Sequence, residues 1–452
     1  MMDLKNKKAL VVGLKRSGVA AARFMAGRGA VVTVTDKAEA EKLVAEREAL
    51  KGVNVRFVFG EHRVENFTNA DLIVVSPGVP LSIPPIEAAR KARVHIIGEL
   101  ELAARFLSLP IIAITGTNGK STVTELTGAI LRESGKKVFV GGNIGNPMIN
   151  LIGKEKETDV AVVEISSFQL EAIEAFHPHI GALLNITPDH LDRYPDMDSY
   201  VKAKARIWMN MGPDDWAVVN ASDELSVATM AGAKCRRLNF SIKPKGTKKP
   251  RAYVKASKLV IELDDRIEKI PVGKMKIAGA HNIENALASV SASLLAGASP
   301  QGAIKAIETF PGLPHRTQFI REVGGVKYFD DSKGTNVGAV IKSLEGFDTP
   351  VVLIAGGLDK EGDFRALRPI VSEKVKALVL IGSAAKKIEE ALGDVTPVEH
   401  ARDMQEAVRK SQALAKPGEV VLLSPGCASF DMFRDYGHRG EVFQEAVRGL
   451  KG

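Results

Sequence analysis

A chain of 452 residues is too long for one hydrophobic core, and its length predicts about three domains. Its content of 45% hydrophobic and 26% charged residues is typical of a soluble globular protein and excludes a disordered chain. The net charge of +8 could serve nucleic-acid binding, but the one dense basic run is KPKGTKKPR, residues 243–251. Because that run contains two prolines, a glycine and no aromatic residue, we interpret it as a solvated loop and expect no nucleic-acid partner.

The cysteine content and the apolar segments both favour a cytoplasmic protein. Cys235 and Cys427 provide neither a disulfide framework nor metal-ligand spacing, which indicates a reducing compartment. The apolar patch ALVVGL near the N-terminus is interrupted by Lys15 and Arg16, so it is too short for an export signal. No segment approaches the ~18 apolar residues that a membrane helix needs, and we expect no membrane insertion.

The first predicted α/β segment opens with a strand, a glycine loop, a helix and a second strand that ends at Asp36. The loop supplies Gly13 and Gly18, but Lys15 occupies the middle glycine position of G-x-G-x-x-G, where the backbone must approach a pyrophosphate. Asp36 could bind a sugar hydroxyl. This degenerate pattern favours a phosphate or nucleotide ligand without identifying it.

The second segment begins with an apolar strand, a loop and a helix in PIIAITGTNGKSTVTELTGAIL, residues 110–131. The strict G-x-x-x-x-G-K-[ST] pattern fails because Ile114 stands where its first glycine belongs. Backbone N–H groups at the start of a helix still bind phosphate oxygens. Lys120 would reach the β- and γ-phosphates, and Ser121 or Thr122 would bind magnesium. The pattern therefore predicts a nucleotide site rather than a simple turn.

Two further side chains follow strands of the same segment. Glu164 ends the strand DVAVVEI, and His190 follows the strand GALLNIT, so both lie at the expected carboxyl edge of the sheet. Both could complete a magnesium site, although magnesium prefers oxygen ligands. The pattern leaves His190 open between a metal ligand and a helix-start residue that bonds to the backbone. Residues 235–276 alternate like a small antiparallel sheet, and a helix with small residues follows them.

The third segment follows FPGLPHR and repeats the order strand, loop, helix. Polar residues gather where its strands end: Asp331, Ser332, Lys333, Thr335, Lys360 and Ser429. Lysines and hydroxyls at one sheet edge would suit a small carboxylate-bearing substrate. Each of these residues alone is more often a solvated loop lysine or a turn former.

Taken together, the motifs closely resemble those of the ATP-dependent Mur ligases of bacterial cell-wall synthesis, over essentially the whole chain. The general family pattern is matched by TGTNGKST, GGNIGNP, EISSFQLE, NITPDHLDRY, GAHNIENALA and GLPHR. Three further motifs are similar to those of the members that add D-glutamate: SPGVP, DDSKGTN and SPGCASFDMF.

The resemblance implies an α/β protein of three domains. A Rossmann-like UDP-substrate-binding domain would span residues 1–98, and a Rossmann-like amino-acid-binding domain residues 313–452. Between them, residues 99–312 would form an ATP-binding domain of the phosphate-loop ATPase type, with a parallel sheet and a small antiparallel sheet. The implied reaction ligates D-glutamate to UDP-N-acetylmuramoyl-L-alanine through an acyl phosphate, in peptidoglycan precursor synthesis. ATP and two magnesium ions would be required, and we expect a monomer.

The resemblance also implies roles for individual residues. The UDP portion would be bound by Arg16, Ser17, Asp36, Lys37, Ser76, Gly78 and Asn143. ATP would be bound by Gly116, Thr117, Asn118, Gly119, Lys120, Ser121, Thr122, Asn285, Arg316 and Asp331. D-Glutamate would be enclosed by Lys333, Thr335, Lys360, Ser429, Phe430 and Tyr436. Catalysis would depend on Lys120, Glu164, His190 and Lys204. The metal ligands would be Ser121, Glu164, His190 and a carbamylated Lys204.

Lys204, in YVKAK, matches the lysine that these ligases carry as a carbamate, whereas the sequence by itself predicts one more exposed helix lysine. Two other functional classes remain as alternatives. A nicotinamide dehydrogenase could use the first segment, but Lys15 in its glycine loop argues against it. A nucleotide-switch protein could use the phosphate loop, but it would not need the strand-end lysines of the third segment.

Overall fold

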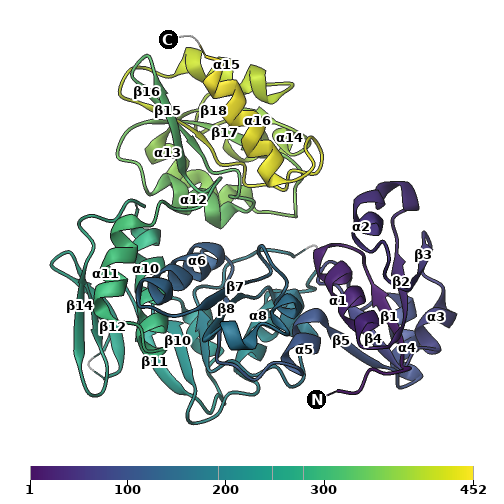
Figure 1. Ribbon diagram of the computed structural model, residues 1–452. Coiled ribbons are helices and arrows are strands. Elements are labelled where there is room, and N and C mark those ends of the chain that lie inside the picture. The colour runs from purple at the N-terminus through teal and green to yellow at the C-terminus, as the bar shows by residue number, and fades with distance from the viewer. Residues whose placement is uncertain (1, 192, 247, 278, 451–452) are drawn as a thin grey trace.

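The computed structural model describes residues 2–191, 193–246, 248–277 and 279–450, and three α/β units follow one another along this chain (Figure 1). Each unit has its own sheet, and the strands of the three sheets lie within residues 8–98, 111–271 and 318–423. The predicted class, three α/β units with largely parallel sheets, is confirmed.

The N-terminal unit is a five-stranded, wholly parallel sheet with the order β3-β2-β1-β4-β5. Its inner strands are short and continuously apolar because they are covered on both faces. The strands are β1 (Lys8–Val12), β2 (Val31–Asp36), β3 (Val55–Phe59), β4 (Leu72–Val75) and β5 (His95–Gly98). The helices are α1 (Arg16–Gly27), η1 (Ala40–Lys42), α2 (Val44–Ala49), α3 (Val64–Thr68) and α4 (Pro84–Lys91).

The central unit has a nine-stranded sheet with the order β14-β13-β12-β11-β10-β9-β6-β8-β7. Its strands are β6 (Ile111–Thr115), β7 (Val138–Gly142), β8 (Val160–Glu164), β9 (Ile180–Leu183), β10 (Trp216–Asn220), β11 (Arg236–Phe240), β12 (Arg251–Lys255), β13 (Lys258–Glu262) and β14 (Ile267–Pro271). Its α-helices are α5 (Glu99–Ala104), α6 (Lys120–Glu133), α7 (Ser167–Glu171), α8 (Met197–Ala205), α9 (Glu224–Ala228), α10 (Ala280–Leu295) and α11 (Pro300–Thr309). Its 3-10 helices are η2 (Met148–Leu151), η3 (Glu155–Glu157) and η4 (Arg206–Trp208).

The predicted antiparallel strands exist, but they extend the central sheet instead of forming a separate small one. β11 pairs in parallel with β10 along its whole length, and β12 joins it through two parallel pairs. Among the described residues of this sheet, the antiparallel pairs are β12 with β13 and β13 with β14. The direction of pairing follows from the connections, because α9 separates the parallel strands β10 and β11, whereas the short turns between β12, β13 and β14 force the antiparallel direction.

The C-terminal unit has a six-stranded sheet with the order β15-β16-β20-β17-β18-β19. β15 pairs antiparallel with β16 at one edge, and the other pairs are parallel. The strands are β15 (Gln318–Val323), β16 (Val326–Asp330), β17 (Val351–Gly356), β18 (Val375–Ile381), β19 (Val398–His400) and β20 (Val420–Leu423). The helices are α12 (Val337–Leu344), η5 (Phe364–Leu367), α13 (Arg368–Lys374), α14 (Ala385–Leu392), α15 (Met404–Leu414) and α16 (Tyr436–Arg448).

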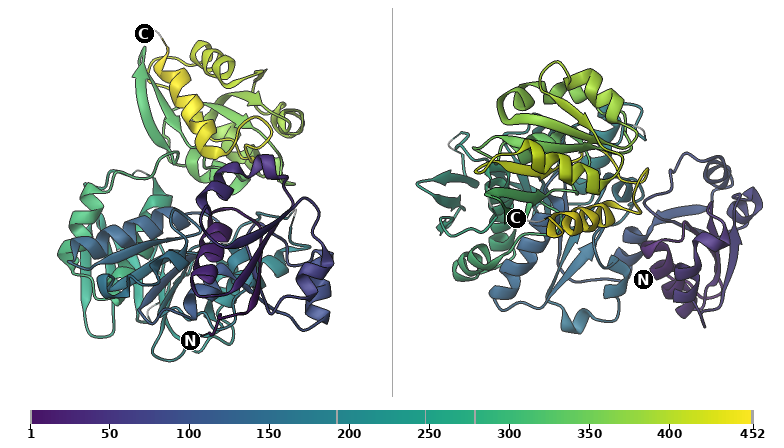
Figure 2. Two further views of the ribbon diagram at one scale, coloured as in Figure 1. Left: turned by 45° about the vertical axis from the view of Figure 1, so that its right-hand side comes forward. Right: turned by 90° about the horizontal axis from the view of Figure 1, so that it is seen from above.

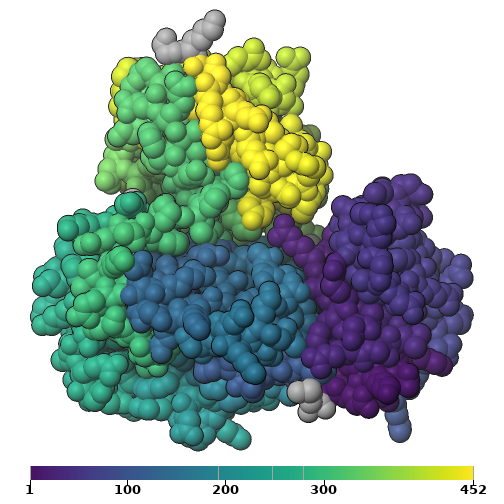
Figure 3. Space-filling view, viewed as in Figure 1, coloured from purple at the N-terminus to yellow at the C-terminus, as the bar shows by residue number. Residues whose placement is uncertain are grey.

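The units differ in how they are joined. The C-terminal unit lies above the central unit, and the N-terminal unit lies to one side of both (Figure 2). One apolar cluster runs through the N-terminal and central units and includes Val11, Leu102 and Ala161. The two clusters that flank the C-terminal sheet take their buried residues from positions 323–447. Figure 3 shows a notch between the C-terminal and N-terminal units on the face in view. Among the described residues, no helix has the length and apolar content to cross a bilayer.

Candidate functional site

The phosphate loop connects β6, a central strand, to the start of α6. Gly116 and Gly119 have φ angles of +155° and +84°, which residues with a side chain rarely adopt. A side chain at position 119 would also collide with the Asn285 side chain of α10. The segment after β9 also fixes the loop, since the Asn118 N–H donates to Asn185 Oδ1 at 2.8 Å. Gly116 and Gly119 let the loop form without the first glycine of the strict pattern, at whose position Ile114 stands.

Lys120 is the first residue of α6, and its side chain folds back over the loop. Its Nζ donates to the carbonyl oxygens of Gly116 at 3.0 Å and Thr117 at 2.8 Å. Burial lowers the pKa of Lys120, while the charges of Glu164 and Asp189 oppose that shift. The amine therefore lies where a phosphate would enter the loop.

Lys204 lies beneath the same loop, with only 1% of its surface exposed. Its Nζ donates to the Gly116 carbonyl oxygen at 2.8 Å and lies 4.6 Å from the centre of the Tyr200 ring. Burial, with the nearby charge of Lys120, holds the pKa of Lys204 well below its ordinary value. The interpretation of Lys204 as an exposed helix lysine is wrong, because α8 turns its Tyr200 and Lys204 face inward.

Glu164 is the last residue of β8, and His190 lies in the loop that follows β9. Glu164 Oε1 accepts a hydrogen bond from Asn143 Nδ2 at 2.8 Å, whereas its buried Oε2 has no hydrogen-bond partner among the described residues. His190 has a φ of +58°, and its ring packs edge-on against Phe168. In the described part of the chain, no three His, Cys, Asp or Glu side chains form a group placed to hold a metal ion.

A cavity of about 390 Å³ opens beside the phosphate loop, between the central and C-terminal units. Its lining includes six residues that the sequence assigned to ATP: Asn118, Gly119, Thr122, Asn285, Arg316 and Asp331. Arg316 Nη2 donates to Ser121 Oγ at 3.0 Å, so the C-terminal segment reaches the first turn of α6. Burial raises the pKa of Asp331 to about 6, although the hydroxyls of Ser343 and Ser424 donate to its carboxylate.

A second cavity, of about 1280 Å³, lies in the N-terminal unit. It is lined by six of the seven residues predicted for the UDP portion: Arg16, Ser17, Asp36, Lys37, Ser76 and Gly78. The seventh, Asn143, lies instead beside Glu164 in the central unit. Both oxygens of Asp36 accept backbone N–H groups, from Leu14 at 2.6 Å and Ala38 at 2.8 Å. The carboxylate thus braces the glycine loop.

The residues predicted for D-glutamate are spread over three loops and the start of α16 in the C-terminal unit. Lys333 lines the nucleotide cavity, and its Nζ lies 3.6 Å from the centre of the Tyr436 ring. Burial and the Arg316 charge lower the pKa of Lys333 to about 7. Thr335 is partly buried in the same loop. Ser429 is buried, whereas the neighbouring Phe430 is 69% exposed, so the structure does not pack these two side chains alike.

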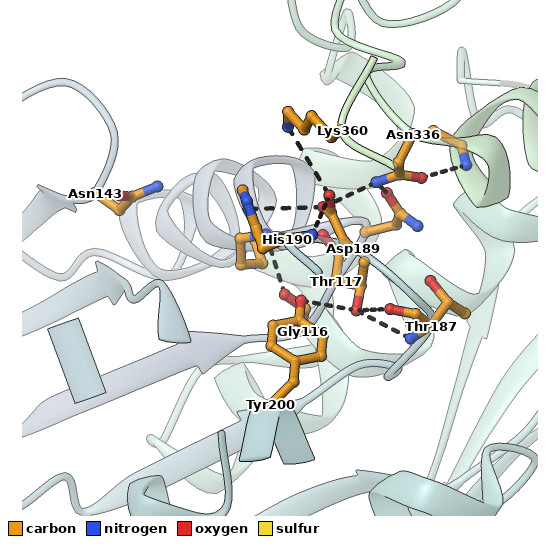
Figure 4. A network of polar contacts seen from close by, with 12 residues as sticks. Gly116, Thr117, Asn143, Thr187, Asp189, His190, Tyr200, Asn336 and Lys360 are labelled. Atoms are coloured by element: carbon orange, nitrogen blue, oxygen red, sulfur yellow. Dashed lines mark hydrogen bonds and ion pairs between the residues drawn. The ribbon is translucent and has the colours of Figure 1, made fainter. Parts of the chain in front are cut away.

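Lys360 introduces a polar network that the sequence reasoning missed. Its Nζ lies 3.8 Å from Asp189 Oδ1, and Asn336 Nδ2 donates to Asp189 Oδ2 at 3.1 Å and to Asn118 Oδ1 at 3.3 Å. Figure 4 shows Asp189 between the His190 ring and these two C-terminal side chains. Asp189 could have been found from the sequence, because it stands beside His190 in NITPDHLDRY. Nothing in the sequence predicts that Asn336 contacts Asp189.

Three family models match the chain, one in each unit. The N-terminal domain of MurD-like Mur ligases matches residues 7–98. The Mur ligase middle domain matches residues 114–293, and the glutamate ligase domain of Mur ligases matches residues 315–427.

Curated relatives match the chain from end to end. A protein of Geotalea daltonii named UDP-N-acetylmuramoylalanine–D-glutamate ligase is 49% identical, over 100% of this chain and 99% of that protein. A protein of the same name from Geobacter sp. (strain M21) is 46% identical over 100% of both chains.

Solved structures of more distant sequence share the fold. The pseudomurein peptide ligase type C of Methanothermus fervidus superimposes with a TM-score of 0.63 at 20% identity, over 99% of this chain and 100% of that one. The UDP-N-acetylmuramate-alanine ligase of Thermotoga maritima gives a TM-score of 0.61, also at 20% identity, over 98% of this chain and 100% of that one.

Proposed function

The chain belongs to the Mur ligase family, and we propose that it joins D-glutamate to UDP-N-acetylmuramoyl-L-alanine in an ATP-dependent step of peptidoglycan synthesis. The observation that carries this proposal is the convergence of two distant segments on one cavity. Asn118 and Thr122 of the phosphate loop line the cavity together with Arg316 and Lys333 of the C-terminal segment. Such a cavity can hold a triphosphate against the groups that bring the second substrate.

The reaction would proceed in two steps. The L-alanyl carboxylate of the UDP-linked substrate attacks the γ-phosphate of ATP, which gives an acyl phosphate and ADP. Lys120, at the phosphate loop, would stabilise the charge of the transferring phosphoryl group. The D-glutamate amine then attacks the acyl carbon, loses a proton and forms the amide as phosphate leaves from a tetrahedral intermediate.

Magnesium would be held by Ser121, Glu164, His190 and a carbamate on Lys204. The buried Glu164 Oε2 fits this role, because an unpaired buried carboxylate oxygen is costly unless a cation or donor meets it. When bound, two magnesium ions would neutralise negative charge on the phosphate oxygens. The lowered pKa of Lys204 favours the neutral amine that reaction with carbon dioxide requires.

The three units would divide the substrates among them, with boundaries at residues 98–99 and 312–313. The UDP portion would occupy the N-terminal cavity, with Asn143 contacting the substrate from the central unit. The amino-acid site would be formed by Lys333, Thr335, Lys360, Ser429, Phe430 and Tyr436. We further propose a cytoplasmic monomer.

The test measures phosphate release by the purified protein with ATP, UDP-N-acetylmuramoyl-L-alanine and D-glutamate. Release should require all three compounds, and mass spectrometry should show the dipeptide product. Phosphate release that is indifferent to D-glutamate would contradict the ligase and favour a nucleotide switch. Lys120→Ala should abolish turnover while the melting temperature stays close to that of the unchanged protein.

A further inference from the structure

The N-terminal cavity is lined by residues of two units. Pro147 and Asn150 come from the central unit, and the other lining residues come from the N-terminal unit. Arg16 and Ser17 lie in the first turn of the twelve-residue helix α1, where backbone N–H groups suit a diphosphate. The sheet order β3-β2-β1-β4-β5 places β2 and β3 farthest from β5, the strand that leads into the central unit (Figure 1). A UDP-linked substrate that extends toward the phosphate loop would therefore place its base near β2 and β3.

Asp36 at the end of β2 is poorly placed to read that base. Each of its two carboxylate oxygens already accepts a backbone N–H group, one from Leu14 and one from Ala38. These bonds hold the loop after β1 and the turn after β2. The group that recognises the base has to come from another residue at this end of the cavity.

His62, which follows β3, also lines the cavity. Its Nδ1 lies 3.0 Å from the hydroxyl oxygen of Thr35, a residue with no exposed surface. Its ring meets the Phe67 ring edge-on, with the ring centres 5.7 Å apart. These two contacts fix the orientation of the imidazole. The second ring nitrogen, Nε2, has no hydrogen-bond partner among the residues that the structure describes.

Burial lowers the pKa of the His62 imidazole, against the opposing charge of Asp36, which favours a neutral ring near pH 7. A neutral ring whose Nδ1 accepts the Thr35 hydroxyl proton carries its own proton on Nε2, which then donates one hydrogen bond to a carbonyl oxygen. The Watson–Crick edge of uracil presents an N–H donor between two carbonyl acceptors. Cytosine presents a different order of donors and acceptors on the same edge.

We propose that His62 is a specificity-determining residue whose Nε2 hydrogen-bonds the edge of the uracil base of the UDP-linked substrate. This inference rests on the proposed function, because it assumes a UDP-linked substrate. Thr35 and Phe67 then act as positioning residues that hold the imidazole toward the ligand.

The test titrates UDP and CDP into the full-length protein by calorimetry, for the unchanged chain and for His62→Ala, His62→Asn and His62→Gln. Asparagine can replace the Nδ1 contact with Thr35, whereas glutamine can place an amide where Nε2 lies. Loss of one hydrogen bond weakens binding by ~5- to 10-fold. We therefore expect His62→Ala and His62→Asn to bind UDP more weakly by this factor, and His62→Gln to lose less affinity. His62→Ala should also show a smaller preference for UDP over CDP.

The control is His95→Ala, since His95 lies in the same unit but pairs with Glu174 outside this cavity. It should bind UDP as the unchanged protein does. Any of three results would overturn the inference. UDP binding could be unaltered in His62→Ala, His62→Gln could bind UDP no better than His62→Asn, or His62→Ala could lose equal affinity for UDP and CDP. Absence of UDP binding by the unchanged protein would overturn the proposed substrate as well. Melting temperatures within a few degrees of one another would show that the variants fold, and a raised KM for the UDP substrate with unchanged KM for ATP gives a second readout.

Discussion

Three lysines around the proposed reaction centre share one property, a lowered pKa. Burial lowers the pKa of Lys120, Lys204 and Lys333, and for Lys333 the value falls to about 7. Nearby cations add to this shift, since the charge of Lys120 lowers the pKa of Lys204 and the charge of Arg316 lowers the pKa of Lys333. Incoming phosphates and carboxylates would relieve this repulsion, so the site is prepared for anionic ligands.

Lys204 provides the first prediction. Lys204→Ala should lower the ligase rate by at least ~100-fold, and formate or acetate should restore part of it by supplying a carboxylate in the vacated space. The matched control is Lys202→Ala, because Lys202 lies on the same helix with its side chain exposed. Steady-state phosphate release, with and without added carboxylate, measures both. Full activity of Lys204→Ala without any carboxylate would contradict the proposed carbamate.

Glu99 leads to a prediction about stability and pH. It is buried at the start of α5, where its Oε1 accepts the Ile149 N–H at 2.7 Å, and burial raises its pKa to about 7 from an ordinary value of 4.5. Because the folded state holds the proton more tightly, stability from this group is complete below pH 4.5 and is lost as the pH rises through 7, by up to ~3 kcal/mol.

Glu99→Gln, which is always neutral, should therefore raise the melting temperature relative to the unchanged protein at pH 8 and change it little at pH 5. Thermal unfolding at the two pH values measures this difference. An equal effect of the substitution at both pH values would show that Glu99 does not titrate in this range.

At the scale of elements, α16 holds together the loops that follow β16 and β20. The guanidinium of Arg439 is fully buried and donates to the Ser332 hydroxyl and carbonyl oxygens at 2.9 and 2.8 Å. It also donates to the carbonyl oxygens of Cys427 and Ala428 at 3.1 and 3.2 Å. These two loops carry Lys333 and Ser429, so one side chain positions both parts of the proposed amino-acid site.

Arg439→Met should leave these carbonyl oxygens without donors and loosen both loops. We expect the KM for D-glutamate to rise at least ~10-fold, with a much smaller change in the KM for ATP. Arg434→Met is the control, since Arg434 is exposed in the turn before the same helix. Equal changes in the two KM values would indicate a general loss of structure instead of a positioning role.

The elements that the sequence predicts well are those whose signal is local. An apolar run followed by glycines and a helix is enough to predict β6, the phosphate loop and α6, because chain neighbours determine that geometry. Alternation also predicted the antiparallel strands β12 to β14. It could not predict that they extend the central sheet, because the pairing of β11 with β10 depends on contacts between distant parts of the chain.

The same limit applies to the candidate site over the whole molecule. The strand-end rule placed Asp331 and Lys333 at the nucleotide cavity and Asp36 at the N-terminal cavity, because parallel strands bring their carboxyl ends to one edge. It did not find Asn336, which meets Asp189 across 147 positions of sequence. The sequence also predicted an exposed side chain for Lys204, which is buried, since the burial of a helix face depends on the sheet against which the helix packs.

The junctions between units differ in chemistry, and this difference affects how the molecule can move. The N-terminal and central units share one apolar cluster, which resists separation. The C-terminal unit contacts the central unit through polar groups such as Arg316 with Ser121 and Asn336 with Asp189. Polar contacts exchange readily with water, so the C-terminal unit is the one whose position substrates and single substitutions should alter most.

Asn336 allows that expectation to be tested, because its two side-chain atoms have separate roles. Oδ1 caps α12 by accepting the Ala339 N–H at 2.8 Å, and Nδ2 donates across the junction to Asp189 and Asn118. Asn336→Ser keeps a capping oxygen and removes the amide group that reaches Asp189, so kcat/KM for D-glutamate should fall ~5-fold, the value of one hydrogen bond. Asn336→Asp keeps the cap but places a carboxylate against Asp189, and its loss should be larger.

Varying the salt concentration distinguishes the loss of a hydrogen bond in Asn336→Ser from the repulsion between carboxylates in Asn336→Asp. Added salt screens repulsion between the carboxylates, so it should recover part of the activity of Asn336→Asp and leave that of Asn336→Ser unchanged relative to the parent protein. Asp403→Ser, at the N-cap of α15 in the same unit, is the control for altering a cap away from the junction.

Small-angle scattering should show a larger radius of gyration for Asn336→Asp at low salt. If both Asn336 variants kept the parent activity and radius, the Asp189 contact would not hold the C-terminal unit, and the Arg316 contact with Ser121 would have to account for its position.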